Sequence, residues 1–288
     1  MGTYYAQKTH TRGKGVELAN IEMPLVVGDI HTEYIRAGAQ AIKTNTFAAN
    51  RIVYQGDEKL VRQILHAGWE IAARAAETTG AFVFADIGPV VGMPHTDILD
   101  EYHFLAEEFL ACGAKHFLFE TNSSADGLIE TARYIKKKCP EAFILDSFSA
   151  FPGGYTRDGR FVEELVHEAA DSHVVDAVGF NCMNGIHQMK ELIHRLEPHD
   201  LPLSLMPNAG HPIVVDGRTF YQSDPGYFGT SLASLAQEGV SIVGGCCGTT
   251  PAYIHTLCDA LAGDKPSVPV AAAEGTVPAK YTPKSPFY

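Results

Sequence analysis

Two hydrophobic patterns alternate along most of the chain. Short apolar runs rich in β-branched residues predict buried strands, and longer segments with apolar residues at helical spacing predict amphipathic helices. The predicted strands are residues 41–47, 82–87, 116–121, 143–148, 178–182, 203–207 and 241–245. The predicted helices are residues 24–38, 58–79, 103–112, 126–138, 160–172, 184–195, 225–238 and 251–262. Residues 1–22 are polar, contain glycine and show no clear strand.

The order of these elements predicts the fold class. Strands alternate with helices through short loops, which indicates parallel βαβ connections. Polar or thiol side chains end several separate strands, as they do in α/β barrels. A doubly wound sheet is the alternative, but no Gly-x-Gly-x-x-Gly sequence follows any strand. We therefore predict an α/β barrel over residues 1–262. Residues 263–288, rich in Pro and Ala, are predicted to form a C-terminal tail.

Composition and charge narrow the classes of partner. The 288 residues carry a formal net charge of −12, which disfavours nucleic acid or an anionic membrane surface as a partner. No apolar stretch approaches the roughly 20 residues that span a bilayer, and no signal peptide opens the sequence. Six cysteines in a chain of this length do not form a disulfide framework, so a reducing cytoplasm is the expected compartment.

The last predicted strand leads into the most specific chemical signal in the sequence. Residues 241–243 are apolar, and residues 244–251 read Gly-Gly-Cys-Cys-Gly-Thr-Thr-Pro. The glycines permit a tight turn, and the threonines followed by proline predict the start of the next helix. Cys246 and Cys247 are therefore expected at the C-terminal end of a strand, where α/β enzymes place their chemistry.

A third cysteine, Cys182, ends the predicted strand 178–182, which reads Val-Gly-Phe-Asn-Cys. Adjacent cysteines do not readily form a disulfide with each other, but both thiolates can bind one metal ion. Three thiolates from two strand ends would leave an open position on a tetrahedral zinc ion, as in a catalytic site. The alternatives are a closed structural zinc site or buried core cysteines. The other cysteines are expected to be ordinary thiols on helices or helix ends: Cys112, Cys139 and Cys258.

Two further motifs precede the cysteines. Residues 44–50 read Thr-Asn-Thr-Phe-Ala-Ala-Asn, and residues 119–122 read Phe-Glu-Thr-Asn. Together with the two cysteine motifs, in this order and spacing, they resemble the zinc-dependent homocysteine S-methyltransferase family, especially the homocysteine-binding module of cobalamin-dependent methionine synthase. The resemblance covers residues 1 to about 262. It implies methyl transfer to the thiol of homocysteine, giving methionine, with three residues as metal ligands and catalytic residues: Cys182, Cys246 and Cys247.

The resemblance also implies a leading strand. Members of the family begin with a strand that reads roughly Leu-Leu-Asp-Gly-Ala-Met-Gly-Thr, whereas this sequence starts at Met-Gly-Thr. Adding that strand to the seven predicted strands gives a (β/α)8 TIM barrel. The first strand is therefore truncated in this sequence: either the true start lies upstream or the strand is absent. Because a barrel without one strand would expose two sheet edges, we favour a start that lies upstream.

Polar residues near strand ends are candidates for substrate binding. Glu120 ends an otherwise apolar strand, where a buried carboxylate needs a cationic partner. The resemblance implies that this partner is the α-ammonium group of the substrate. It also implies that Asn208 provisionally fills the fourth position on zinc, although an asparagine there can equally serve a turn. The remaining substrate-binding candidates are Thr44, Asn45, Thr46, Phe47 and Asn181. Residues expected to shape the donor entrance are Asp86, Gly88, Asp146 and Ser147.

The sequence leaves the methyl donor open. Betaine-using relatives carry a tyrosine directly after Thr-Phe, as cation–π binding requires, but this chain has Ala48 there, and its only tryptophan lies within a predicted helix. Methylcobalamin on a separate corrinoid protein, or S-methylmethionine, is therefore expected. The chain itself lacks the Asp-x-His-x-x-Gly cobalamin signature. Another small thiol or selenol acceptor is an alternative, and so is a non-catalytic partner subunit stabilised by zinc.

Overall fold

The computed structural model describes residues 1–11, 15–91, 94–196, 200–210, 212–215, 218–221 and 224–263. For residues 212–215 and 218–220 only the backbone path is described. The predicted C-terminal tail lies outside the described residues from residue 264 onward. None of the described helices is both long and apolar enough to cross a membrane.

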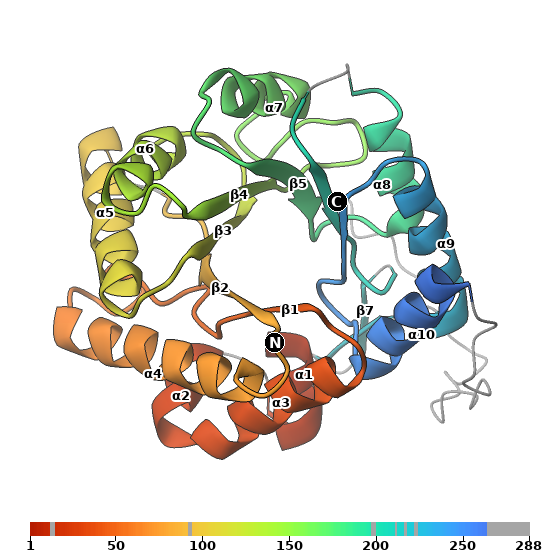
Figure 1. Ribbon diagram of the computed structural model, residues 1–288, viewed down its shortest axis with the longest axis horizontal. Coiled ribbons are helices and arrows are strands. Elements are labelled where there is room, and N and C mark those ends of the chain that lie inside the picture. The colour runs from red at the N-terminus through yellow and green to blue at the C-terminus, as the bar shows by residue number, and fades with distance from the viewer. Residues whose placement is uncertain are drawn as a thin grey trace.

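A single parallel sheet forms the centre of the molecule, and its strands curve around a common axis (Figure 1). Each strand pairs in parallel with the next one along the chain, which confirms the predicted α/β barrel architecture. The seven strands, in sheet order, are β1 (Ala41–Lys43), β2 (Phe82–Ile87), β3 (His116–Asn122), β4 (Phe143–Phe148), β5 (Ala177–Asn181), β6 (Leu203–Met206) and β9 (Ile242–Val243).

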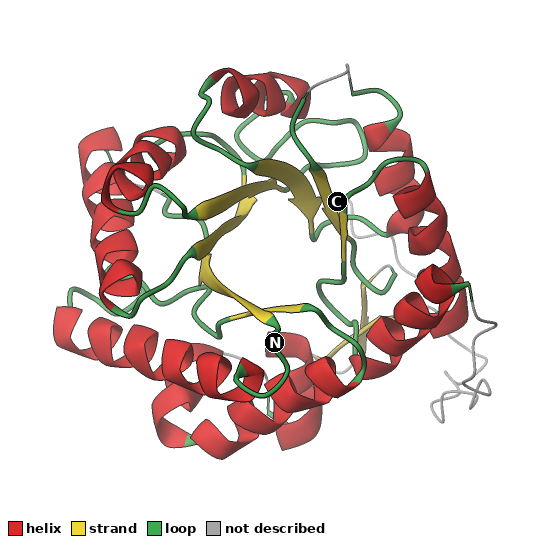
Figure 2. Cartoon of the chain, viewed as in Figure 1, coloured by secondary structure: helices red, strands yellow, loops and turns green. Residues whose placement is uncertain are grey.

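Helices surround this sheet on its outer side (Figure 2). They are α3 (Pro24–Arg36), α4 (Glu58–Ala76), α5 (His95–Ala111), α6 (Leu128–Lys138), α7 (Val162–Asp171), α8 (Ile186–Ile193), α9 (Pro225–Gln237) and α10 (Pro251–Ala262). All eight lie where the periodicity predicts helices. Helix α5 starts at His95, eight positions before its predicted start at residue 103. Its first turns are polar outside, but Ile98 and Tyr102 are buried at helical spacing.

The two faces of the sheet bury different sets of side chains, because successive residues of a strand point to opposite sides. Leu118, Leu145 and Ala177 form a small cluster inside the barrel. Ile144 and Phe148 of β4 instead belong to the large cluster between the sheet and the helices. On β3 and β4, a polar residue near the strand end therefore faces the interior when it lies two positions after Leu118 or Leu145, as Glu120 and Ser147 do.

The sheet has two edges, because β1 and β9 do not pair with each other in the described residues. The N-terminal residues lie close to this opening. The hydroxyl of Thr3 accepts a hydrogen bond from the Gly248 N–H group, 3.1 Å away, and α1 (Gly2–Thr9) packs on α3 through Tyr5. The described residues do not include the leading strand that the resemblance implies. Residues 1–11 and 15–22 contain no strand, as predicted, but form α1, η1 (Val16–Leu18) and α2 (Ala19–Glu22), which the sequence did not predict.

Three strand predictions need correction. Strand β1 ends at Lys43 rather than Phe47, because the Thr44 and Thr46 hydroxyl groups bond each other at 2.6 Å and tie the chain to the β2 backbone. Strand β9 has two residues rather than five, since glycines follow it. An antiparallel hairpin of β7 (Pro212–Val215) and β8 (Arg218–Tyr221) was not predicted.

The core assignment predicts a contrast between two leucines. Leu128 of α6 is 0% exposed within the large cluster, so Leu128→Ala should lower the free energy of unfolding by about 2–5 kcal/mol. Leu25 of α3 is 83% exposed, so Leu25→Ala should change it by less than about 0.5 kcal/mol. Chemical denaturation measures both values. Equal losses for the two variants would contradict this placement of the core.

Candidate metal centre

The three cysteines predicted to bind a metal lie together at the C-terminal ends of the strands. Cys182 follows β5, Cys246 and Cys247 follow β9, and β6 lies between these two strands. Their Sγ atoms all lie within 4.8 Å of one another, and those of Cys182 and Cys247 are 3.8 Å apart. Zinc–sulfur bonds of about 2.3 Å place two sulfurs of a tetrahedron about 3.8 Å apart. The cluster therefore fits a zinc ion bound by three thiolates.

Backbone hydrogen bonds fix the positions of these cysteines. The Cys182 N–H group donates to the Met206 carbonyl at 3.1 Å, and the Cys246 N–H group donates to the Pro207 carbonyl at 2.8 Å. Both cysteine segments are thus tied to the end of β6. Cys182 and Met183 have φ values of 58° and 55°, in the left-handed region that non-glycine residues seldom adopt. Strain of this kind is concentrated at functional sites.

The glycine-rich turn is packed too tightly for side chains. A Cβ atom on Gly245 would lie 2.5 Å from the Thr249 side chain, and one on Gly248 would lie 2.3 Å from the Tyr221 ring. Gly248 also has a φ of +80°. The Thr249 hydroxyl donates to the Cys246 carbonyl at 2.7 Å, and Pro251 begins α10 as predicted. The turn therefore presents both cysteine side chains toward Cys182.

The thiols of the cluster interact strongly with one another. Hydrogen bonds with Cys182 and then Cys246 lower the pKa of Cys247 to about 2. Hydrogen bonds with Cys246 and Cys247 raise the pKa of the Cys182 thiol. One thiolate is therefore stabilised at the expense of its neighbour. A coordinated divalent cation supplies the charge that lets all three thiols ionise.

Two further residues contact Cys247. The side-chain oxygen of Asn208 accepts a hydrogen bond from the Cys247 N–H group at 3.0 Å. The predicted fourth ligand therefore lies beside the cluster, with its oxygen engaged by the backbone. The Tyr221 hydroxyl, on β8, hydrogen-bonds the Cys247 thiolate and helps to lower its pKa. The sequence does not single out Tyr221, because the hairpin that carries it has no distinctive pattern.

A second cluster, of charged residues, lies next to the sulfurs. The side chains of Glu120 and Asp86 are 5% and 3% exposed, and both form ion pairs with Lys43. The Lys43 ammonium group donates a hydrogen bond to Glu120 Oε2 and lies 3.9 Å from Asp86 Oδ2. Burial disfavours the charge on Lys43, but Glu120 and Asp86 outweigh burial and raise its pKa. Burial, and then Glu120, raises the pKa of Asp86.

Asn181 joins the charged cluster to the sulfur cluster. Its amide nitrogen donates to Glu120 Oε2 at 3.2 Å and lies 4.0 Å from the Cys246 sulfur. Its oxygen accepts from the Ser147 hydroxyl at 2.8 Å and from the Thr121 N–H group at 2.9 Å. The register between β3 and β4 shifts after Phe119, and such an irregularity re-aims side chains at a strand end. The structure thus brings Glu120, Asn181 and the cysteines together, as the sequence predicts.

The other predicted substrate residues are engaged in the scaffold. The Asn45 amide donates to the Val16 carbonyl and to Asn20, both within 2.9 Å. The Thr46 hydroxyl donates to the Asp86 carbonyl at 2.7 Å. Thr44 bonds the Asp86 N–H group at 3.0 Å, and the partly exposed Phe47 packs against Gly88. These contacts support a role in shaping the site, and direct contact with substrate stays a prediction.

One predicted entrance residue lies elsewhere. Asp146 is 0% exposed and shares the helix-facing side of β4 with Ile144 and Phe148, so it does not line the barrel mouth. Neither of its carboxylate oxygens has a hydrogen-bond partner among the described residues. Burial raises the pKa of Asp146 to about 7.

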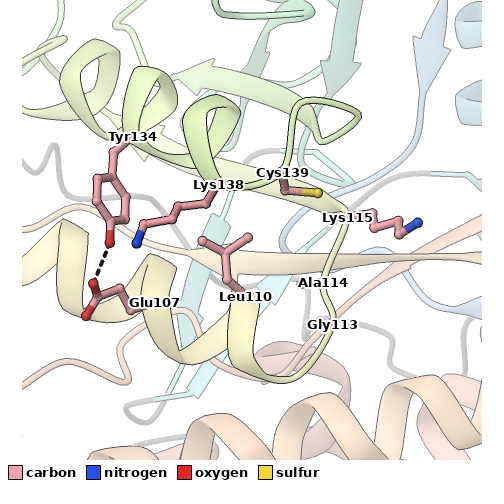
Figure 3. Close-up of a pocket in the computed structure, with 8 residues that line it drawn as sticks. All are labelled: Glu107, Leu110, Gly113, Ala114, Lys115, Tyr134, Lys138 and Cys139. Atoms are coloured by element: carbon pink, nitrogen blue, oxygen red, sulfur yellow. Dashed lines mark hydrogen bonds between the residues drawn. The ribbon is translucent and has the colours of Figure 1, made fainter.

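A cleft of about 380 Å³ between α5 and α6 lies away from these clusters (Figure 3). Its lining includes Ala114 and Lys115, just before β3, and Cys139, just before β4. The cleft is therefore near the N-terminal ends of the strands, whereas the cysteine cluster is at the C-terminal ends. Figure 3 shows Tyr134 bonded to Glu107 across it. It contains none of the predicted site residues.

Comparison with solved structures confirms the fold class. The homocysteine methyltransferase MmuM from Escherichia coli, in its metallated form, superposes with a TM-score of 0.69 at 21% sequence identity. The match covers 88% of this chain and 92% of that one. The likeness establishes an α/β fold with a curled parallel sheet of the TIM-barrel type.

Sequence comparison defines the family. Residues 1–261 match the family model for homocysteine S-methyltransferase. The chain is 32% identical over 301 residues to the methionine synthase of Mycobacterium tuberculosis (strain ATCC 25618 / H37Rv). This alignment covers 92% of this chain and 24% of that protein. It is 25% identical to the homocysteine S-methyltransferase of Escherichia coli (strain K12), over 88% of this chain and 92% of that one. The chain belongs to the homocysteine S-methyltransferase family, and it spans about a quarter of the methionine synthase it matches.

The packing of the cysteine turn predicts that Gly248→Ala will weaken metal binding. The new methyl group has no room beside Tyr221, and φ must stay positive, so the turn has to move. Gly113→Ala is the matched control, because Gly113 has a φ of +84° and a methyl group added there would meet nothing within 4 Å. Zinc affinity should fall in Gly248→Ala alone, although both variants should lose about 1 kcal/mol or more of stability. Equal zinc affinities would contradict the packing argument.

The raised pKa of Asp146 predicts that the free energy of unfolding decreases as pH rises toward neutrality. Because its pKa is raised to about 7 in the folded state, the folded protein binds this proton more tightly than the unfolded chain. The contribution of Asp146 to the free energy of unfolding should therefore fall as pH rises from about 4 to about 7, by on the order of 4 kcal/mol. Asp146→Asn removes this dependence. Denaturation curves of both proteins at several pH values test it, and parallel pH profiles would refute it.

Proposed function

We propose that this protein transfers a methyl group to the thiol of homocysteine and produces methionine, with zinc bound by Cys182, Cys246 and Cys247. The observation that carries the proposal is the convergence of these three sulfurs within 4.8 Å beside a buried carboxylate. Membership of the homocysteine S-methyltransferase family supports it. So does the E. coli relative of that name, which is matched over 92% of its length.

The donor set fits zinc in a nucleophile-activating role. Cys182, Cys246 and Cys247 would hold the ion as three thiolates with a net charge of −1, and the ion would supply the positive charge that favours the deprotonated, nucleophilic form of a substrate thiol. A free thiol has a pKa near about 8.5 and is mostly protonated at neutral pH. Asn208, beside Cys247, remains our provisional fourth ligand before the acceptor binds.

The charged cluster orients the acceptor. Glu120 is nearly buried and is held by the Asn181 amide, so its carboxylate is fixed in place for the α-ammonium group of an amino acid. Asn181 also lies 4.0 Å from the Cys246 sulfur, which puts ammonium recognition and sulfur chemistry one side chain apart. The acceptor thiol releases its proton to solvent, its sulfur forms a bond to the methyl carbon as the bond between methyl and donor breaks, and the donor keeps the electron pair of that bond. Fixed orientation of the sulfur is what the protein contributes to this displacement.

The donor we propose is methylcobalamin on a partner protein, with S-methylmethionine as the second candidate. Exposed apolar side chains follow the C-terminal ends of the strands, where a large donor would approach: Phe47, Phe151, Tyr155 and Met183. Ala48 offers no aromatic ring to a quaternary ammonium group, which disfavours betaine. The methionine synthase relative extends well beyond the matched region, which supports a partner module.

Two alternatives keep the metal site. The acceptor can be another small thiol or selenol, which Glu120 disfavours unless that molecule carries an ammonium group. A non-catalytic subunit would have a zinc ion whose coordination is closed. We also propose a cytoplasmic location, because all six cysteines are free thiols, as a reducing compartment keeps them.

The decisive experiment compares two cysteine variants. Cys246→Ala should lose zinc and lower methyl transfer by at least about a hundredfold, because one of three thiolate ligands is removed. Cys139→Ala, in the cleft of Figure 3, is the matched control and should keep both. Zinc content is measured together with methionine formation from methylcobalamin, S-methylmethionine and betaine in parallel.

X-ray absorption separates the alternatives. Homocysteine should add a sulfur neighbour to zinc and replace a nitrogen or oxygen neighbour. An unchanged zinc environment would favour the non-catalytic subunit, and full turnover by Cys246→Ala would overturn the proposed function.

A further inference from the structure

Lys43 is a charged residue of the site to which the proposed function gives no role. It is the last residue of β1, and its ammonium group donates a hydrogen bond to Glu120 Oε2 and lies 3.9 Å from Asp86 Oδ2. Glu120 thus already has a cationic partner before any substrate arrives. An α-ammonium group can bind Glu120 only if this ion pair is opened or shared.

We propose that Lys43 is a specificity-determining residue that binds the α-carboxylate of the acceptor amino acid while Glu120 binds its α-ammonium group. The inference rests on the proposed function and deepens it, because it names the group by which the same site selects a zwitterionic thiol. Lys43 and Glu120 carry the charges of a zwitterion in reverse, so one amino acid satisfies both.

Charge balance supports this exchange. A buried ion pair that loses one partner leaves an uncompensated charge, at a large cost. A thiol with only an ammonium group would take Glu120 from Lys43 and leave Lys43 with the more distant Asp86 alone, and a thiol with only a carboxylate would take Lys43 from Glu120. A zwitterion replaces one ion pair by two and leaves the total charge of the cluster unchanged.

The geometry allows Lys43 to move between partners. Its side chain is 24% exposed, whereas those of Glu120 and Asp86 are 5% and 3% exposed, so Lys43 is the most accessible of the three charges. Its four-carbon side chain is flexible, whereas the Asn181 amide holds Glu120. Asp86 Oδ2 already lies 3.9 Å from the Lys43 ammonium group, and Asp86 Oδ1 has no hydrogen-bond partner among the described residues, so Asp86 can stay paired with Lys43 when Glu120 binds the substrate.

Four thiols that differ only in charge test the proposal. Homocysteine carries both groups, 4-mercaptobutyrate only the carboxylate, 3-mercaptopropylamine only the ammonium group, and 1-propanethiol neither. Titration calorimetry measures their dissociation constants on the zinc-loaded full chain. The variants are Lys43→Met, which keeps length without charge, Lys43→Arg, which keeps the charge, and Glu120→Gln. Thermal unfolding checks that each variant is folded.

In Lys43→Met we expect homocysteine and 4-mercaptobutyrate to bind about tenfold more weakly or worse, as loss of a charge-assisted hydrogen bond implies. 3-Mercaptopropylamine and 1-propanethiol should bind at least as tightly as before. Lys43→Arg should restore homocysteine binding to within about threefold of the original. Glu120→Gln should show the mirror pattern and weaken homocysteine and 3-mercaptopropylamine.

Equal weakening of all four thiols in Lys43→Met would mean that Lys43 only supports the fold, and would overturn the inference. Unchanged homocysteine affinity would do the same. If Lys43→Met does not fold, the original protein still decides, because it must bind homocysteine at least about tenfold more tightly than 3-mercaptopropylamine. If the zinc-loaded protein binds none of the thiols, the proposed function itself fails, which is a separate outcome.

Discussion

The constraint on which this structure depends is that three sulfur atoms from two separate strands must share one small space. Thiols this close perturb one another, as the opposite pKa shifts of Cys182 and Cys247 show. The scaffold keeps them together through backbone hydrogen bonds to the end of β6 and through the left-handed conformation of Cys182. Coordination of a metal ion would turn the repulsion between neighbouring thiolates into attraction to a shared cation.

The charged cluster is a second group of side chains that separate strands bring together. Glu120, Asp86 and Lys43 come from three neighbouring strands and converge inside the barrel, where any unpaired charge is costly. Asn181 bridges the two clusters, with one nitrogen near both Glu120 and Cys246. In the proposed function, recognition of the acceptor and binding of its sulfur would therefore be parts of one connected arrangement rather than two independent sites.

Much of the fold was predictable, because its signals are local. The helices and central strands have strong periodicity, and the glycine-flanked cysteines announce a turn at a strand end. The ends of β1 and β9 were not predictable, since they depend on contacts such as that between Thr44 and Asp86. Helix α1 was missed because Tyr5 is its only buried residue, too few for a periodic pattern.

The site was predictable to the extent that its residues stand at strand ends. Cys182, Cys246, Cys247, Glu120 and Asn181 all do, and the structure brings them together. Lys43 also ends a strand, but the predicted strand continued to residue 47, and Tyr221 lies on a hairpin that was not predicted, so neither residue was found in this way. An isolated lysine reads as a surface residue, and only the tertiary structure shows that it faces Glu120. Asp146 was expected at the donor entrance, but alternation along β4 puts it on the same side as Ile144 and Phe148, which face the helices.

The shortness of β9 has a consequence for how the barrel holds together. This edge strand has two residues and, within the described residues, pairs on one side only, with β6, yet two of the three cysteines follow it closely. An ion that joins Cys246 and Cys247 to Cys182 would link the segment after the edge strand β9 to the segment after β5. Metal binding would then stabilise the pairing of β9 with β6. The backbone amide hydrogens of Ile242 and Val243 would exchange with solvent at a rate set by how often the bonds between the ion and the cysteines break.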